Sequence, residues 1–187
     1  QTITEKTTSI NNNTSDTELE EVTIDLESFK HPVKYLAWVL VNEHPSDPNV
    51  LPVLDNPGQG PCYFTSLCSS SEHGNDGHDG SLELILNTET LFTKRNMSYF
   101  TRVLPSKYCN YNIPELDRIG IYSFSLEPFN LQPSGTMNFS TIESGKKMRI
   151  KIANIYRNKL KNRNLHIFAI NYNIFRIIDG QGGLAYD

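Results

Sequence analysis

The chain has 187 residues, of which 37% are hydrophobic and 20% charged, and its formal net charge is −4 at pH 7. This length suits one domain, or one domain with a tail, and the charge disfavours a dedicated nucleic-acid binder. The longest apolar run, Leu36 to Val41, is far shorter than the about 20 residues of a membrane-spanning helix. Three cysteines without a CxxC spacing favour neither a disulfide framework nor a thiolate zinc site.

The two ends of the chain differ in charge. Residues 1–27 carry seven acids and one base, and the stretch 1–20 is rich in Thr, Ser and Asn. Because such a stretch has little to bury, we predict a flexible N-terminal arm or linker over 1–20 and a folded domain over 21–187. Residues 146–163 carry eight bases and no acid. Either a strand with a solvated face or a patch for an acidic partner explains this bias, and the alternation of Met148, Ile150 and Ile152 favours the strand.

Alternating apolar residues predict strands along most of the chain, since successive side chains of a strand point to opposite faces. Residues 34–41 are more continuously apolar, which suits a central strand covered on both sides. No window of 12 or more residues shows a helical period. The predicted apolar faces are Val22, Ile24 and Leu26; Leu82, Leu84 and Leu86; Tyr122, Phe124 and Leu126; and Phe168, Ile170, Tyr172 and Ile174.

Long loops separate these strands. The stretch 44–61 contains five prolines, and 69–80 is rich in Ser, Gly and Asp. Seven or eight strands with long connections predict an all-β fold, a jelly-roll β-sandwich of two antiparallel sheets.

Side chains able to bind a metal gather only in residues 72–80, and this segment matches neither an EF-hand nor a cupin site. There is no GxSxG motif, and the glycines of 180–183 lack the helix and Lys-Ser/Thr of a phosphate loop. We therefore predict no catalytic residue, no metal site and no cofactor. A carbohydrate-binding module is the alternative function, because aromatic residues in predicted loops could stack on sugars; they are Tyr63, Phe64, Tyr108 and Tyr111.

Four ordered blocks resemble the major capsid proteins of large nucleocytoplasmic DNA viruses. The blocks are 31–39 (HPVKYLAWV), 92–100, 122–140 with its QPSGTMNFS, and 171–186 (NYNIFRIIDGQGGLAY). Departures from the family pattern stand at Met137, Thr141, Gln181 and Asp187, so a divergent paralogue or minor capsid component stays an alternative.

This resemblance implies a structural protein, not an enzyme, whose subunit has two consecutive jelly rolls and forms trimeric, pseudo-hexagonal capsomers of an icosahedral shell. The blocks belong to the second roll, and Gln1 in place of Met favours an excerpt over a one-roll variant. The implied partners are further copies and other capsid proteins in a virion assembled in the host cytoplasm. Contacts with an internal membrane, minor capsid proteins and glycans are left open, and no specific nucleic acid is expected.

The residues that we expect to serve assembly follow from the same blocks. We expect Gly135 to adopt a positive φ in a sharp corner that supports packing between rolls or subunits, and the terminal glycines to tuck Leu184 and Tyr186 against a neighbour. The complete set is His31, Pro32, Gln132, Pro133, Ser134, Gly135, Asn138, Phe139, Asn171, Tyr172, Asn173, Arg176, Gly180, Gly182, Gly183, Leu184 and Tyr186.

Overall fold

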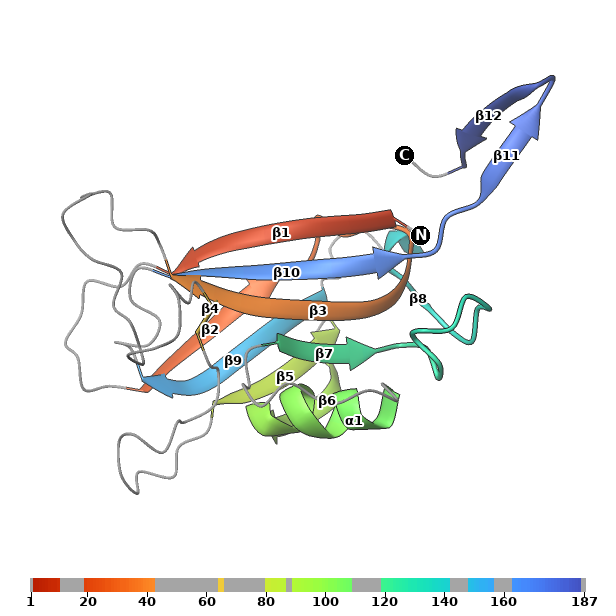
Figure 1. Ribbon diagram of the computed structural model, residues 1–187. Helices are drawn as coiled ribbons and strands as arrows, with labels where there is room; N and C mark the ends of the chain where they lie inside the picture. Colours follow the sequence, from red (N-terminus) through yellow and green to blue (C-terminus); the bar gives the residue numbers. More distant parts are fainter. Residues whose placement is uncertain are drawn as a thin grey trace, which may run out of the picture.

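A computed structural model describes residues 2–10, 19–42, 64–65, 80–86, 89–108, 119–141, 148–156 and 163–185. Its first sheet is antiparallel, with the long strand β3 at its centre (Figure 1). β10 pairs with one edge of β3 and β1 pairs with β10, while β7 and two short strands share the other edge of β3. These strands are β1 (Thr2–Ile10), β10 (Arg163–Asn171), β3 (Pro32–Asn42), β7 (Ile119–Ser123), β4 (Phe64–Thr65) and β8 (Met137–Asn138).

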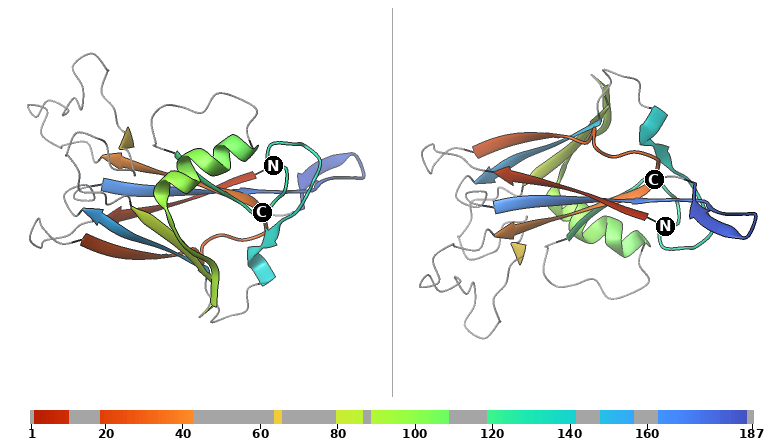
Figure 2. Two further views of the ribbon diagram at one scale, coloured as in Figure 1. Left: turned by 90° about the horizontal axis from the view of Figure 1, so that it is seen from below. Right: turned by 90° about the horizontal axis from the view of Figure 1, so that it is seen from above.

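The second sheet lies beneath the first, and its four strands run in the order β2-β9-β5-β6 (Figure 2). All three neighbouring pairs are antiparallel. The strands are β2 (Leu19–Asp25), β9 (Met148–Tyr156), β5 (Ser81–Leu86) and β6 (Glu89–Asn96).

The pairing of the strands is nested along the chain. β1 pairs with β10, β2 with β9, β3 with β7, and β5 with β6, which is what results when one long hairpin is folded over into two sheets. This is the jelly-roll arrangement, and it confirms the predicted fold class.

The core lies between the two sheets, where each contributes one apolar face. Trp38 of β3 is 1% exposed, and its indole lies directly on Gly120 of β7. A Cβ atom at Gly120 would come within 2.2 Å of the indole, so only glycine leaves room for Trp38 here. The second sheet supplies the buried Ile24, Leu26, Leu82, Leu84, Met148, Ile150 and Ile152, as their alternation predicted.

One helical segment follows β6, with a π-helical turn (Tyr99–Val103) continuing into α1 (Leu104–Tyr108). Phe100 from this segment is fully buried, and its ring centroid lies 5.5 Å from that of Trp38. The segment therefore covers one side of the core (Figure 2). In the described part of the chain, no helix is long and apolar enough to cross a membrane.

The structure corrects the prediction of a flexible arm for Thr2–Ile10, which forms β1, the first of the nested strands. The inward positions of β1 carry Thr4, Lys6 and Thr8 instead of apolar residues, so the sequence shows no hydrophobic alternation there. Two of them make polar contacts: the Lys6 ammonium donates to the carbonyl of Asp25 across the sandwich, and the Thr4 hydroxyl accepts from the Asn171 amide of β10. Residues 11–18 lie outside the described residues, and the remaining domain boundary stays a prediction.

The opposite charge biases of the two ends meet in the β2–β9 pair. The Lys151 ammonium forms an ion pair with Glu21, and Asp25 stands opposite Arg149 in the register. The basic stretch therefore forms a strand over 148–156. Its Met148, Ile150 and Ile152 are buried, and its Arg149 and Lys151 lie beside acidic residues. Residues 157–162 are outside the described ranges, as are all of 44–61 and residues 69–79.

Two strand predictions were wrong in detail. The buried face of β10 is Leu165, Ile167 and Ala169, while Phe168 is only half-buried on the outer face, and the bulge at Ile170/Asn171 ends the alternation. After the loop that follows β7, the chain forms the two-residue β8 and then a 3-10 turn, Phe139–Thr141 (η2). Likewise β3 is central but not fully covered, since Tyr35, Ala37 and Val39 on its outer face are half-buried.

Candidate functional site: the motif corner

Three of the four motif blocks come together at one end of the sandwich. We call this place the motif corner: the start of β3 (residues 31–34), the segment from the end of β7 to η2 (residues 123–141), and the end of β10 (residues 171–173). Val33 pairs with both Met137 and Asn171 in the sheet, so a single residue of β3 joins all three segments.

His31 and Pro32 anchor the corner through their backbone. The φ of His31 is 70°, in the left-handed region that non-glycine residues seldom occupy. Two hydrogen bonds hold it there: its N–H donates to the Ser140 hydroxyl at 2.7 Å, and its carbonyl accepts the Phe139 N–H at 3.1 Å. The Pro32 carbonyl accepts the Tyr172 N–H at 3.0 Å. The block that begins β3 is thereby tied to both other blocks.

Lys34 lies at the centre of the corner and is 0% exposed. Its ammonium donates to the carbonyl of Asn130 at 2.6 Å and lies 5.1 Å from the centre of the Tyr172 ring. Its own carbonyl accepts the Phe124 N–H at 3.0 Å. A buried ammonium is costly unless it has such partners, so Lys34 fixes the loop around Asn130 to β3.

A serine bridge closes the loop between β7 and β8. The hydroxyl oxygens of Ser134 and Ser125 are 2.6 Å apart, and the Ser134 hydroxyl also accepts the Glu127 N–H at 2.8 Å. The next residue, Gly135, has a φ of 141°, and a Cβ atom there would lie 3.0 Å from the Phe124 carbonyl oxygen. The sequence prediction of a sharp corner with positive φ at Gly135 is confirmed.

Phe139 and Asn138 complete the far side of the loop. Phe139 is 5% exposed, and its ring packs edge-on against Phe29 at 6.3 Å and Phe124 at 5.9 Å between centroids. The Asn138 side-chain oxygen accepts the Ser140 N–H at 3.0 Å, which begins the η2 turn. Phe139 therefore joins the corner to the main core.

At the end of β10, Asn171 ties the corner to the first strand. Its side chain is 1% exposed, and its amide nitrogen donates to the Thr4 hydroxyl at 3.0 Å and to the Lys30 carbonyl at 3.1 Å. Asn173 accepts the N–H of Ile174 at 2.8 Å where the chain leaves the sandwich.

The remaining motif residues do not join this network. Gln132 and Pro133 are exposed. The C-terminal block instead forms a separate hairpin of β11 (Phe175–Ile178) and β12 (Gln181–Leu184), which extends away from the sandwich (Figure 1). Asp179 and Gly180 make its turn, both with positive φ (52° and 79°), as a tight hairpin of type I′ requires. All eight strand residues of this hairpin, Arg176, Gly182, Gly183 and Leu184 among them, are exposed. Tyr186 lies outside the described residues.

Sequence reasoning did not place Lys34, Ser125 or Asn130 among the site residues. A charged residue within the apolar run of β3 was the available signal for Lys34, because lysine is almost never fully buried unless it is paired. Nothing in the sequence singled out Ser125 or Asn130.

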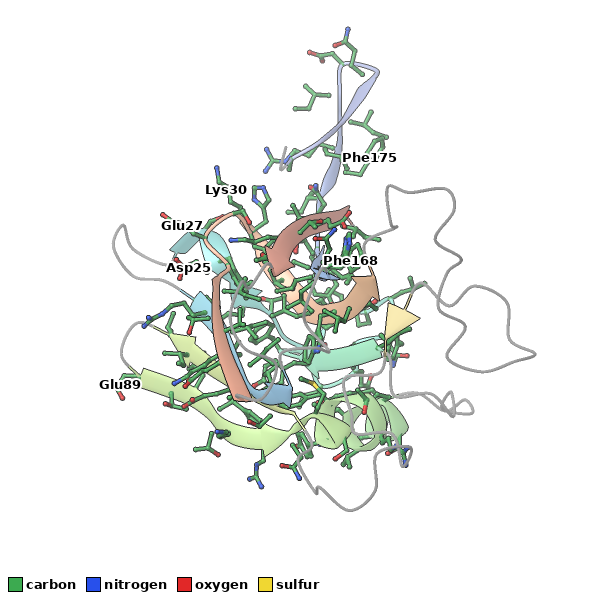
Figure 3. The ribbon with its side chains drawn as sticks, turned by 90° about the vertical axis from the view of Figure 1, so that its left-hand side faces the viewer. Asp25, Glu27, Lys30, Glu89, Phe168 and Phe175 are labelled. Carbon is green, nitrogen blue, oxygen red and sulfur yellow. The ribbon has the colours of Figure 1, made fainter. Side chains whose placement is uncertain are left out.

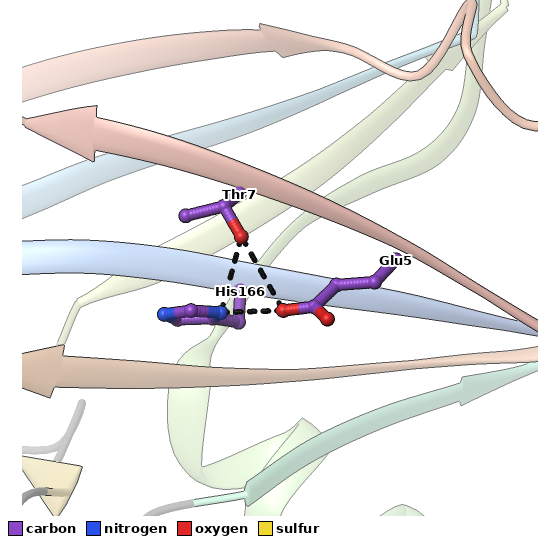
Figure 4. Close-up of polar contacts among 3 residues, drawn as sticks. All are labelled: Glu5, Thr7 and His166. Carbon is purple, nitrogen blue, oxygen red and sulfur yellow. Dashed lines mark hydrogen bonds and ion pairs between the residues drawn. The ribbon is translucent and has the colours of Figure 1, made fainter.

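A second polar cluster lies on the outer face of the first sheet, between β1 and β10 (Figure 4). His166 Nδ1 is 2.6 Å from a Glu5 carboxylate oxygen and 3.2 Å from the Thr7 hydroxyl. A hydrolytic triad needs the carboxylate and the hydroxyl on opposite ring nitrogens, whereas here both reach the same nitrogen. This cluster is therefore a surface contact that joins two strands, not an activated nucleophile.

The described residues contain no group of three or more His, Cys, Asp or Glu side chains that could hold a metal, and the 72–79 segment lies outside them. Of the aromatic residues considered for sugar stacking, Tyr108 packs against the core, and burial, with a smaller contribution from Tyr99, raises its pKa. Tyr63 and Tyr111 are outside the described ranges.

Fold and corner together define a jelly-roll domain in which the motif residues hold strand ends and loops together. Comparison with known proteins agrees. Residues 1–183 match the family described as large eukaryotic DNA virus major capsid protein. The chain therefore belongs to this family, whose members are structural proteins and not enzymes.

Individual relatives support the assignment. The chain is 33% identical over 184 residues to the major capsid protein of Paramecium bursaria Chlorella virus 1. The alignment covers 85% of this chain and 42% of that protein. It is 36% identical over 104 residues to the major capsid protein of Phaeocystis pouchetii virus. That alignment covers 56% of this chain and 19% of that protein.

Among solved structures, PBCV-1 VP54 fitted into a reconstruction of the virophage Sputnik matches with a TM-score of 0.66 and 25% identity, over 100% of this chain and 50% of that chain. The Faustovirus major capsid protein shares the fold, with a TM-score of 0.56 and 14% identity, over 89% of this chain and 32% of that chain. The chain thus spans half or less of the length of these relatives.

Proposed function

We propose that this chain is a jelly-roll unit of a viral shell subunit that assembles into trimers with a pseudo-hexagonal footprint, and that these trimers tile an icosahedral capsid. The family match over residues 1–183 carries the proposal. The half-length coverage of PBCV-1 VP54 supports a subunit with a second roll of similar size.

The motif corner has a mechanical role in this proposal. A shell subunit has to present loops and edges to its neighbours in a fixed orientation, since an ordered surface loses less conformational entropy on association. Lys34, Ser134 and Asn171 hold three segments in one arrangement. The corner thereby orients the 124–136 loop, and the end of β10 from which the hairpin emerges.

The partners in this proposal are further copies of the subunit and other capsid proteins, in a virion shell assembled in the host cytoplasm. The same proposal includes contacts with an internal membrane, minor capsid proteins and glycans. We do not assign these contacts to particular residues. Specific nucleic-acid binding is not part of it, in keeping with the net charge of −4.

The direct test is the mass and shape of the purified full-length subunit, measured by sedimentation equilibrium and by negative-stain electron microscopy. The proposal expects a mass three times that of the subunit and particles with three-fold symmetry and a nearly hexagonal outline, because each subunit contributes two rolls. A monomer at all concentrations, or an assembly with another symmetry, would contradict it.

A further inference from the structure

The two sheets of the sandwich differ in the outer face that each turns away from the core. On the second sheet the central outward positions are mostly charged, and the register places Arg149 opposite Asp25 and Lys151 opposite Glu83. Alternation of buried apolar and outward polar residues is typical of an antiparallel sheet whose outer face meets water. The outward residues at the centre of β2, β9 and β5 are Thr23, Asp25, Arg149, Lys151, Glu83 and Ile85.

The outer face of the first sheet is apolar instead. Residues directly opposite each other in an antiparallel pair point to the same face, so Phe168, Ala37 and Ile121 form one row across β10, β3 and β7. Ile119 is 48% exposed, and Phe168 lies across the sandwich from Asp25 (Figure 3). We call this surface the outer apolar face, and its residues are Tyr35, Ala37, Val39, Ile119, Ile121 and Phe168.

Charge is confined to the margin of the outer apolar face. Among the described outward residues of β1, β10, β3 and β7, Glu5 is the one Asp, Glu, Lys or Arg, and it contacts His166 beside the β1 edge. An apolar centre without charged residues and a polar rim are the composition of a stable protein contact. The first sheet therefore presents to the outside what the second sheet presents only to the core.

The sequence of β3 shows the same requirement. Its apolar run is continuous, which is typical of a strand that is covered on both faces. The sandwich covers one face, where Leu36, Trp38 and Leu40 are at most 1% exposed. On the other face, Phe129 packs at one end, with its ring 5.6 Å from that of Tyr35. The remaining cover has to come from outside the described residues.

The coverage of the relatives indicates what supplies this cover. The chain spans 50% of PBCV-1 VP54 and 42% of the major capsid protein of Paramecium bursaria Chlorella virus 1, so a full-length subunit of that size holds a second body about as large as this one. A body linked to the same chain is present at an effective concentration of about millimolar, far above that of a second copy in solution. It therefore reaches an apolar face of its own subunit first.

We propose that the outer apolar face packs against the other half of the full-length subunit, so that the first sheet becomes covered on both sides. The contact is permanent, in keeping with its apolar centre, because obligate contacts are more hydrophobic than transient ones. This inference rests on the proposed function, since it requires a subunit with a second roll, and it assigns the face through which the two halves meet.

Thiol labelling tests whether the face is covered. Ala37→Cys places a probe at its centre, Ile121→Cys is a second probe if the first variant does not fold, and Thr23→Cys on the charged outer face of β2 is the matched control. In the full-length subunit, diluted until it is monomeric, the probe should react with a maleimide at least about tenfold more slowly than in the chain 1–187, because a covered thiol reacts only when the contact opens. Thr23→Cys should react equally fast in both, and peptide mass spectrometry reads each site.

Isotope mixing tests which molecule covers the face. A photoreactive diazirine residue in place of Ala37 is introduced into light and heavy full-length subunits, which are mixed before they assemble. The proposal predicts crosslinks to the other half of the subunit that join only peptides of the same isotope. Crosslinked pairs of one light and one heavy peptide would show that a second copy covers the face, and would overturn the proposal.

The remaining outcomes separate this inference from the proposed function. Slow labelling of Ala37→Cys already in the chain 1–187 would mean that the chain covers its own face, and fast labelling in the full-length subunit would mean that nothing does; either would overturn the inference. Trimers of full-length subunits with a fast-labelling probe would leave the proposed function standing. A protected probe in a subunit that never forms trimers would support the inference and contradict the trimer.

Discussion

The motif corner and the C-terminal hairpin both consist of family-like residues, yet they are completed in different ways. At the corner, Lys34 is fully buried and its ammonium meets a carbonyl and an aromatic ring of the same chain. In the hairpin, Phe175 and Ile177 are more than half exposed and meet no such partner surface among the described residues. The first region shows how the chain fixes its own shape, and the second shows what it leaves for another molecule. Variants should therefore affect folding at the corner and association at the hairpin.

Lys34→Ala should have the largest effect on folding. It removes a fully buried side chain and leaves the Asn130 carbonyl without its donor, which together cost about 2–5 kcal/mol of unfolding free energy. Urea denaturation followed by tryptophan fluorescence measures this through Trp38. Lys34→Met, which keeps the apolar stem, should lose less, and Lys94→Ala on the exposed face of β6 should lose almost nothing. A loss below about 1 kcal/mol for Lys34→Ala would show that the corner does not depend on this residue.

Gly135→Val should have the second-largest effect on folding. The φ of 141° and the nearby Phe124 carbonyl leave valine strained, at a cost of about 1–3 kcal/mol, and the displaced loop should reduce trimer assembly. Thermal unfolding and sedimentation report the two effects. Thr136→Val is the matched control, because it places the same side chain at the neighbouring exposed position, which has no positive φ. Normal trimers from a folded Gly135→Val chain would contradict a role for the corner in assembly.

Ser134→Ala should lower the free energy of unfolding by less than Gly135→Val does. It removes the contact with Ser125 and the acceptor for the Glu127 N–H, which is worth about 1–2 kcal/mol. Ser106→Ala, which loses one exposed hydrogen bond to Val103, serves as the control. If the two variants unfold at the same denaturant concentration, the serine bridge does not hold the loop.

Phe175→Ser should have the smallest effect on folding of all, within about 0.5 kcal/mol when measured on the dissociated chain, since its side chain is 64% exposed. Its effect on association should nevertheless exceed that of Ser134→Ala. Unfolding at low concentration and sedimentation at high concentration separate the two readouts. A large loss of stability in the dissociated chain would mean that Phe175 packs on its own subunit.

Much of the fold could be predicted from the sequence, because buried faces alternate where both sheets meet. Val22 to Leu26 and Met148 to Ile152 have such faces, and both lie in the second sheet as predicted. β1 could not be predicted in this way, since its inward residues are the polar Thr4, Lys6 and Thr8. Two of these make polar contacts with residues far along the chain, Lys6 with Asp25 and Thr4 with Asn171. Phe168 was assigned to the wrong face because the bulge near Ile170 shifts the period.

The sequence predicted which motif residues matter at the site, but not how they come together in space. The positive φ of Gly135 follows from its place in a turn, whereas the convergence of three blocks on Val33 and Lys34 depends on the register between β3, β8 and β10. No local pattern contains that register. The separation of Arg176 and Leu184 from the corner likewise depends on β10 ending at Asn171 and the chain then leaving the sandwich.

Hydrogen exchange read by mass spectrometry, above and below the concentration at which the chain associates, tests the central claim most directly. The account predicts that the amides of Phe124, Phe139 and Tyr172 at the corner exchange slowly at both concentrations, because they are bonded within the chain. The amides of 175–184 should exchange quickly in the dissociated chain and slowly in the assembly. Slow exchange of the hairpin in the dissociated chain, or fast exchange at the corner, would contradict the account.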